Sequence, residues 1–181
     1  MLYIDVPSRE LYNKETNRIF TVKGRRLQLE HSLVSISKWE AKWKKPFLRK
    51  EKMTSEEFID YVKCMTLTQN VEPDVYNCLS VENLHQIVDY INDPMTATTF
   101  FEDPSKKPGR QRTITSELVY YWMTALNIPM ECQKWHFNRL LTLIRVANIE
   151  NAPKKKTSKG DIMRRNKALN DARRKALNTR G

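Results

Sequence analysis

The stretch TSELVYYWMTALNIPMECQKWHFNRLLTLIRVAN, residues 115–148, decides the fold because it predicts two amphipathic helices joined by a tight corner. Thr115 or Ser116 can cap the first helix, since a side-chain oxygen there accepts a free backbone N–H. Asn127 tolerates the left-handed conformation that ends helices, and Pro129 disfavours helical geometry in the residue before it. We therefore expect an αα-hairpin at the centre of the core.

The apolar spacing within this hairpin predicts which side chains are buried. The inward face of the first helix is expected to consist of Leu118, Tyr121, Trp122 and Ala125. The second helix is expected to carry one apolar face made of Cys132, His136, Leu140, Leu143, Ile144 and Ala147. Trp135, Phe137 and Leu141 lie close beside that face, so water should reach only part of this helix.

Ahead of the hairpin, residues 1–31 predict a small antiparallel β-sheet. Leu2–Val6 and Arg18–Val22 are short β-prone runs, and residues 26–30 alternate polar and apolar side chains. Between the first two runs, PSRELYNKETN contains turn-forming residues. We expect about three strands, with one side of the sheet packed on helices.

The middle of the chain predicts several capped helices. Trp39 and Trp43 lie one helical turn apart on an apolar stripe, which favours core positions over base stacking despite the neighbouring lysines. Thr54 with Glu57 forms a capping-box pattern. Ser80 can cap a further helix, whose inward stripe is expected to be Leu84, Ile87, Val88 and Ile91.

Residues 93–113 are rich in proline and end in a basic run, KKPGRQR. They predict a long connecting loop, of a kind that is often mobile or functional. Phe100 and Phe101 are expected to anchor its first half. The whole pattern predicts an α+β, mainly α fold. A small N-terminal sheet (1–31) precedes a helical bundle with a C-terminal αα-hairpin (32–152), and a basic, partly helical tail (153–181) follows.

The net charge of +11 is concentrated at one end of the chain. Residues 153–181 hold 11 Lys and Arg against two Asp, whereas residues 1–152 hold 21 basic and 19 acidic residues. The tail has sparse apolar positions, so its helix should be marginal alone and could order on binding a partner. The tail residues expected to contact a polyanion or protein partner are Lys154, Lys155, Lys156, Arg164, Arg165, Arg173 and Arg174.

The sequence gives little support for enzyme chemistry. The four glycines cannot form a phosphate-binding loop, and no apolar run is long enough to cross a bilayer. Cys132 and His136 are spaced i, i+4, but two ligands do not make a metal site, and a reactive thiol would need an accessible pocket. We expect no catalytic residues, no metal and no cofactor. A cysteine-dependent enzyme is the weakest alternative.

Four segments carry a resemblance to a known protein family. They are YYWMTALNIPMECQKWHFNRLLTLIRVANIENAPKKK (120–156), MRRNKALNDARRKALNTRG (163–181), LEHSLVSISKWEAKWKKPFL (29–48) and YVKCMTLTQNV (61–71). These strings resemble tail assembly chaperones of long-tailed, siphovirus-type bacteriophages. The resemblance extends from about residue 27 to the C-terminus.

The resemblance implies a non-catalytic assembly factor in the host bacterial cytoplasm that is absent from the mature virion. Such factors keep the tape-measure protein soluble and help recruit tail-tube subunits, and a homo-oligomer is compatible with this role. No membrane partner is expected. The candidate client-binding side chains are Tyr120, Tyr121, Trp135 and Phe137, each of which could instead belong to the core.

Two alternatives remain open at this point. The basic tail, together with Lys106–Arg112, could bind nucleic acid through phosphate contacts, although the tail lacks aromatic residues for stacking. The protein could also be a minor structural component of the virion.

Overall fold

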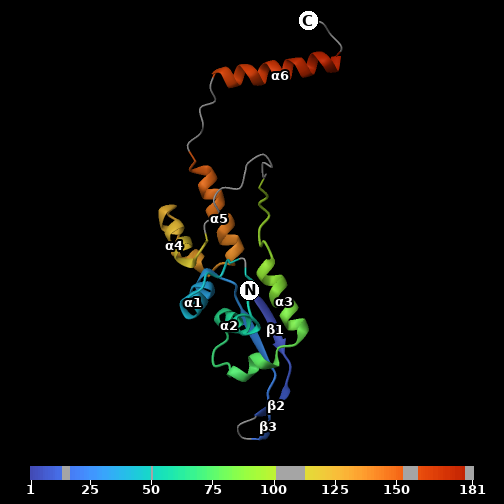
Figure 1. Ribbon diagram of the computed structural model, residues 1–181, viewed down its shortest axis with the longest axis vertical. Coiled ribbons are helices and arrows are strands. Elements are labelled where there is room, and N and C mark those ends of the chain that lie inside the picture. The colour runs from blue at the N-terminus through green and yellow to red at the C-terminus, as the bar shows by residue number, and fades with distance from the viewer. Residues whose placement is uncertain (14–16, 50, 101–112, 153–158, 178–181) are drawn as a thin grey trace. The chain divides into compact units, whose positions relative to one another are not determined.

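The computed structural model describes residues 1–13, 17–49, 51–100, 113–152 and 159–177 (Figure 1). The chain divides into two compact units, residues 1–148 and 149–181, which are described separately. Short strands at the N-terminus precede a series of helices, so the predicted α+β, mainly α class is confirmed. The strands are β1 (Leu2–Val6), β2 (Arg9–Asn13), β3 (Arg18–Val22) and β4 (Arg25–Leu29).

The four strands form two successive antiparallel pairs, β1 with β4 and β2 with β3. The register does not shift between the two pairs, which run from Leu2 opposite Leu29 to Asn13 opposite Arg18. The prediction of about three strands missed β2, which lies inside the segment interpreted as turn-forming. Its sequence, RELYN, has too few β-branched residues to stand out from the turn formers around it.

The side of the two-stranded ribbon that faces the core changes where the β1–β4 pair meets the β2–β3 pair. Buried positions are odd-numbered in β4, at Leu27 and Leu29, but even-numbered in β3, at Val22. Because successive side chains of a strand point to opposite faces, this change of parity means that the core-facing side switches. Gly24 permits the change, because a Cβ there would lie 2.9 Å from the Val6 carbonyl oxygen and 3.0 Å from the Ser8 nitrogen.

Each of the first four α-helices begins after a hydroxyl residue whose side chain accepts a backbone N–H. Thr54 and Glu57 form the predicted capping box, and Thr115 rather than Ser116 caps the fourth helix. The helices and their caps are α1 (Leu33–Trp43, Ser32), α2 (Ser55–Met65, Thr54), α3 (Val81–Asn92, Ser80) and α4 (Ser116–Ala125, Thr115). The 3₁₀ helix η1 (Pro73–Cys78) lies between α2 and α3.

The core of residues 1–148 lies between the β1–β4 pair and the helices around it. Trp39 is fully buried and its Nε1 donates to the Glu57 carbonyl at 2.9 Å, which confirms the core assignment. Trp43 is half-buried and its Nε1 donates to Asp60 Oδ2 at 3.0 Å. Both tryptophans therefore contact α2 through hydrogen bonds.

The helical hairpin differs from the prediction at its corner. Asn127 adopts the expected left-handed conformation, with φ of 52°. The 3₁₀ helix η2 (Met130–Lys134) follows, and α5 (Phe137–Glu150) begins later than expected. Cys132 and His136 therefore precede the second helix rather than lining it. His136 forms a β-bridge with Ser32, and this pairing keeps the backbone extended immediately before α5.

The buried face of α4 also differs from the predicted one. Ser116, Val119 and Met123 are buried, whereas Tyr121 and Ala125 are exposed. Helix α4 packs against α1. Apolar side chains cover most of the α4 circumference, so periodicity alone could not indicate which stripe would face the core.

Helix α3 buries a stripe that is rotated from the predicted one. Ile87 is buried as expected, together with Asn83 and Tyr90, and this side packs on β1. Val88 is 41% exposed, so its assignment to the core was wrong. Leu84 and Ile91, the other members of the predicted stripe, are half-buried.

The unit formed by residues 149–181 contains helix α6 (Lys159–Leu177), as expected for a partly helical tail. Within the described ranges, no helix combines the length and the apolar character needed to span a membrane.

Candidate functional site

The hairpin region presents two aromatic side chains to solvent. Tyr121, on α4, is 66% exposed. Trp135 lies between η2 and α5, is 37% exposed, and has the Arg139 guanidinium 4.4 Å from its ring centroid. A half-exposed indole held by a cation offers a preordered apolar surface, which suits contact with another protein.

The other two candidate aromatics are less accessible. Tyr120 is half-buried and its hydroxyl donates to Gln133 Oε1 at 3.0 Å, which links α4 to η2. Burial raises the pKa of Tyr120. Phe137 is only 2% exposed, and its ring meets the His31 ring edge-on at 5.7 Å between centroids. Phe137 is therefore a core residue, and its inclusion among surface candidates was wrong.

The candidates chosen from the sequence did not include one exposed residue of this region. Met130, at the start of η2, is 48% exposed. The available signal was its place directly after Pro129, where the helical periodicity of the hairpin is interrupted. A flexible thioether next to exposed aromatics is typical of adaptable protein-binding surfaces.

Cys132 and His136 are both buried and do not share a helix face. The His136 Nε2 hydrogen-bonds to the Tyr90 carbonyl at 2.9 Å, on α3. The hydrogen bond therefore links the residue before α5 to α3, outside the hairpin. Among the described residues, no group of three or more His, Cys, Asp and Glu side chains is arranged to hold a metal ion.

His136 belongs to a buried polar cluster that joins several elements. Its ring lies 5.0 Å from the His31 ring and 4.8 Å from the Tyr90 ring, between centroids. His31 Nδ1 hydrogen-bonds to the Tyr61 hydroxyl, and the Tyr90 hydroxyl donates to Glu30 Oε1 at 2.7 Å. The cluster connects the end of β4, α2, α3 and the start of α5.

Burial sets the protonation of this cluster. Burial, helped by the nearby His136, lowers the pKa of His31 to about 3, and burial lowers the pKa of His136 as well. Burial also raises the pKa of Tyr61 and of Tyr90. Both histidines are therefore neutral and both tyrosines protonated near neutral pH. Tyr61 is fully buried, so its hydrogen bond lies inside the core. The hydrogen bonds of the cluster therefore hold the fold together.

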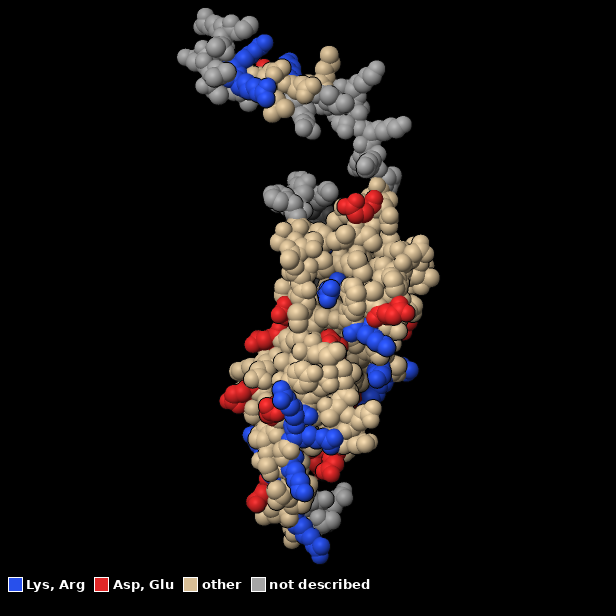
Figure 2. All heavy atoms as spheres, turned by 180° about the vertical axis from the view of Figure 1, so that it is seen from behind, with Lys and Arg blue, Asp and Glu red and all other residues tan. Residues whose placement is uncertain are grey.

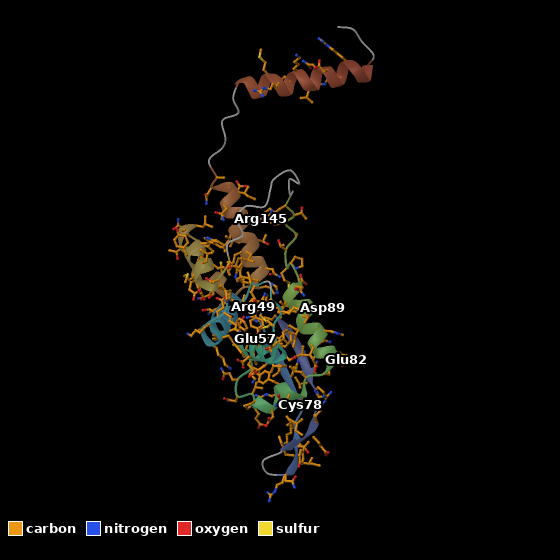
Figure 3. The ribbon with its side chains drawn as sticks, in the orientation of Figure 1. Arg49, Glu57, Cys78, Glu82, Asp89 and Arg145 are labelled. Atoms are coloured by element: carbon orange, nitrogen blue, oxygen red, sulfur yellow. The ribbon has the colours of Figure 1, made fainter. Side chains whose placement is uncertain are left out.

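Two acidic residues of α2, Glu57 and Asp60, are held by cations. Glu57 accepts from Lys45 Nζ at 2.8 Å and from Arg49 (Figure 3). The hydrogen bond from Lys45, followed by that from the Thr54 backbone, lowers the pKa of Glu57 to about 2. Asp60 contacts Lys42 and the Trp43 indole. Glu57 therefore anchors the segment after α1, and Asp60 anchors the last turn of α1.

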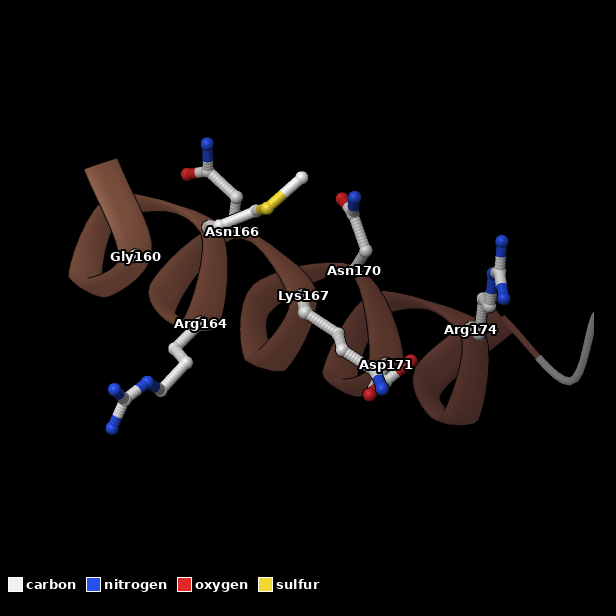
Figure 4. Close-up of a pocket in the computed structure, with 8 residues that line it drawn as sticks. Gly160, Arg164, Asn166, Lys167, Asn170, Asp171 and Arg174 are labelled. Carbon is white, nitrogen blue, oxygen red and sulfur yellow. The ribbon is translucent and has the colours of Figure 1, made fainter.

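The basic residues of the tail lie in part on α6. Arg164, Arg173 and Arg174 are exposed. Arg165 belongs to the same helix, and Lys154–Lys156 and Lys106–Arg112 lie outside the described residues. The hollow along α6 is lined by residues of that helix alone, including Arg164, Lys167 and Arg174 (Figure 4). It is a helix surface rather than an enclosed pocket.

The surface of residues 1–148 carries both signs of charge close together (Figure 2). This mixture agrees with the nearly balanced charges of residues 1–152. Comparisons of the chain with protein-family models, with curated proteins and with solved structures found no match.

Proposed function

We propose that this protein is a tail assembly chaperone of a long-tailed bacteriophage. It binds the tape-measure protein, helps tail-tube subunits to assemble, acts in the host cytoplasm and is absent from the finished virion. The observation that carries the proposal is the resemblance of residues 27–181 to that family, together with the absence of a recognisable catalytic motif in the sequence.

The exposed side chains of the hairpin supply a surface suited to this role. A chaperone for extended helices needs apolar contacts that can be released again, so several weak contacts serve better than one strong one. Tyr121, Met130 and Trp135 are all exposed. Arg139, stacked on Trp135, adds a cation that can pair with acidic residues of a client.

Co-expression with the tape-measure gene tests the proposal. The protein should form a soluble complex that survives nuclease treatment. Trp135→Ala should fold normally, since the indole is partly exposed, and should hold less client. Leu67→Ala, at a residue that is 50% exposed outside the hairpin, is the matched control. A complex with normal composition and yield in Trp135→Ala would remove this surface from the proposal.

Nucleic-acid binding is the second candidate function, favoured by the exposed arginines of α6. Binding through phosphates would weaken steeply with salt, because each neutralised phosphate releases condensed counterions. A pull-down that yields only nucleic acid, eluting over a narrow salt range, would favour this candidate. Mass spectrometry of purified virions tests the third candidate, a minor virion protein, which would be present there.

A further inference from the structure

Helix α3 carries a second apolar stripe besides the one that packs on β1. Val81, Leu84, Val88 and Ile91 follow each other at intervals of three, four and three residues. Val81 is 62% exposed and Val88 is 41% exposed, whereas Leu84 and Ile91 are half-buried. This is the spacing with which a helix meets another helix in a coiled coil.

The stripe continues into a groove beside α2. Leu84 lines a hollow of about 290 Å³ together with Phe58 and Ile59 of α2 and with Met53 before it. These four side chains are all half-buried, so each has apolar surface left to cover. A side chain of a helix lying along α3 could therefore enter the groove.

The charges of α3 restrict what can lie along it. Residues 81–93 contain Glu82, Asp89 and Asp93 but no Lys or Arg. Glu82 and Asp89 directly follow the two exposed valines in the sequence. Figure 3 shows both carboxylates on α3. Among the described residues, neither carboxylate takes part in an ion pair. Glu82 accepts hydrogen bonds from its own backbone N–H and from Ser80, and both carboxylates can still pair with cations of a partner.

We infer that the outer stripe of α3 binds an amphipathic helix of a client protein whose apolar residues are flanked by Lys and Arg. A second copy of α3 fits poorly, because it would bring the same carboxylates against Glu82 and Asp89. The inference rests on the proposed function, and it adds to that function a surface and the charge of the helix bound there.

Two synthetic helices of about three heptads test the charge preference. Both carry Leu at the first and fourth positions of each heptad, and the flanking positions carry Lys in one peptide and Glu in the other. Fluorescence anisotropy with the full chain should show binding of the Lys peptide that weakens with salt. The Glu peptide should bind at least about tenfold more weakly. Equal affinities would overturn the inference.

Variants of the full chain locate the binding surface. Val88→Glu should keep the fold, because the side chain is partly exposed, and should weaken binding of the Lys peptide about tenfold or more. Leu67→Glu introduces the same charge at an exposed position outside α3 and should leave the affinity unchanged. The double variant Glu82→Lys, Asp89→Lys should shift the preference toward the Glu peptide. Unchanged binding in Val88→Glu would overturn the inference.

Sedimentation and co-expression separate the remaining outcomes. If Val88→Glu turns an oligomer into a monomer and the Lys peptide does not compete, the occupant is a second copy and the inference is wrong. If wild type and Val88→Glu hold equal amounts of tape-measure protein, the inference fails while the proposed function stands. If wild type holds no tape-measure protein but binds the Lys peptide through α3, the function fails while the surface assignment stands.

Discussion

Glu40 shows how a single carboxylate can fix two segments that are distant in the sequence. Its side chain is buried, accepts from the Phe47 backbone N–H at 2.7 Å, and accepts from the Ser116 N–H at the same distance. One oxygen thus holds the segment after α1, and the other holds the first turn of α4. No local pattern marks this residue, since its partners are 7 and 76 positions away.

Glu40→Gln should destabilise the fold. The glutamine side chain keeps one oxygen as an acceptor, but its NH₂ group would face the other backbone N–H, and both are donors. One buried N–H is then left without an acceptor, at a cost of about 1–3 kcal/mol. Urea unfolding followed by tryptophan fluorescence measures the change. Glu56→Gln, on the exposed side of α2, is the matched control and should stay close to wild type. Equal midpoints for the two variants would contradict the role given to Glu40.

The buried histidines predict how stability changes with pH. Between pH 6.5 and 4.5 the unfolded chain binds a proton at His31, whereas the folded chain, with a pKa of about 3, does not. The free energy of unfolding should therefore fall as pH falls, by up to about 1.4 kcal/mol per pH unit for one histidine. His136 contributes in the same direction.

Glu57 adds to this loss at lower pH. Its pKa is about 2 in the folded protein, so the unfolded chain is protonated first as pH falls below 4.5. Urea unfolding at pH 7.5, 6.5 and 5.5 (about one-unit steps) measures the histidine contribution before Glu57 adds to it. His31→Gln should flatten the profile above pH 4.5, and an unchanged slope in that variant would contradict the assignment.

At the scale of elements, short-range sequence signals predicted where helices begin but not which face of a helix is buried. The capping pairs at Thr54 and Ser80 lie within four residues, so the sequence contains the whole interaction. The position of α5 depends instead on pairing with Ser32 and His31. The same limit explains the surface candidates, because the burial of Phe137 is decided by a strand end about a hundred residues earlier in the sequence.

Alanine substitutions at Gly24, where the core-facing side of the ribbon changes, and at Gly160 should have opposite effects. Gly24→Ala should destabilise residues 1–148 by about 1–3 kcal/mol, because the new methyl group meets the Val6 and Ser8 backbone rather than a movable side chain. Gly160→Ala lies within α6 and should increase helicity. Circular dichroism and urea unfolding of both variants check this, and a stabilised Gly24→Ala would show that the ribbon can relax.

At the scale of the whole chain, the division into two units predicts independent folding of the first. Deleting residues 153–181 leaves α5 intact to Glu150 and removes most of the excess positive charge. The shortened chain should keep a single cooperative urea transition and an unchanged near-ultraviolet spectrum, since all four tryptophans lie before residue 149. A broadened transition would show that the tail contributes to the stability of the first unit.

The hydrogen bond from the Phe137 N–H to the His31 carbonyl, at 2.7 Å, also bears on the order in which the chain folds. Phe137 fills the space against the His31 ring, so the interior built by the strands and the first helices stays open until the start of α5 arrives. Closing so long a loop is entropically costly and slows folding relative to other mainly helical proteins. Synthesis from the N-terminus therefore leaves that interior accessible to water, and to cellular folding factors, until residue 137 has left the ribosome.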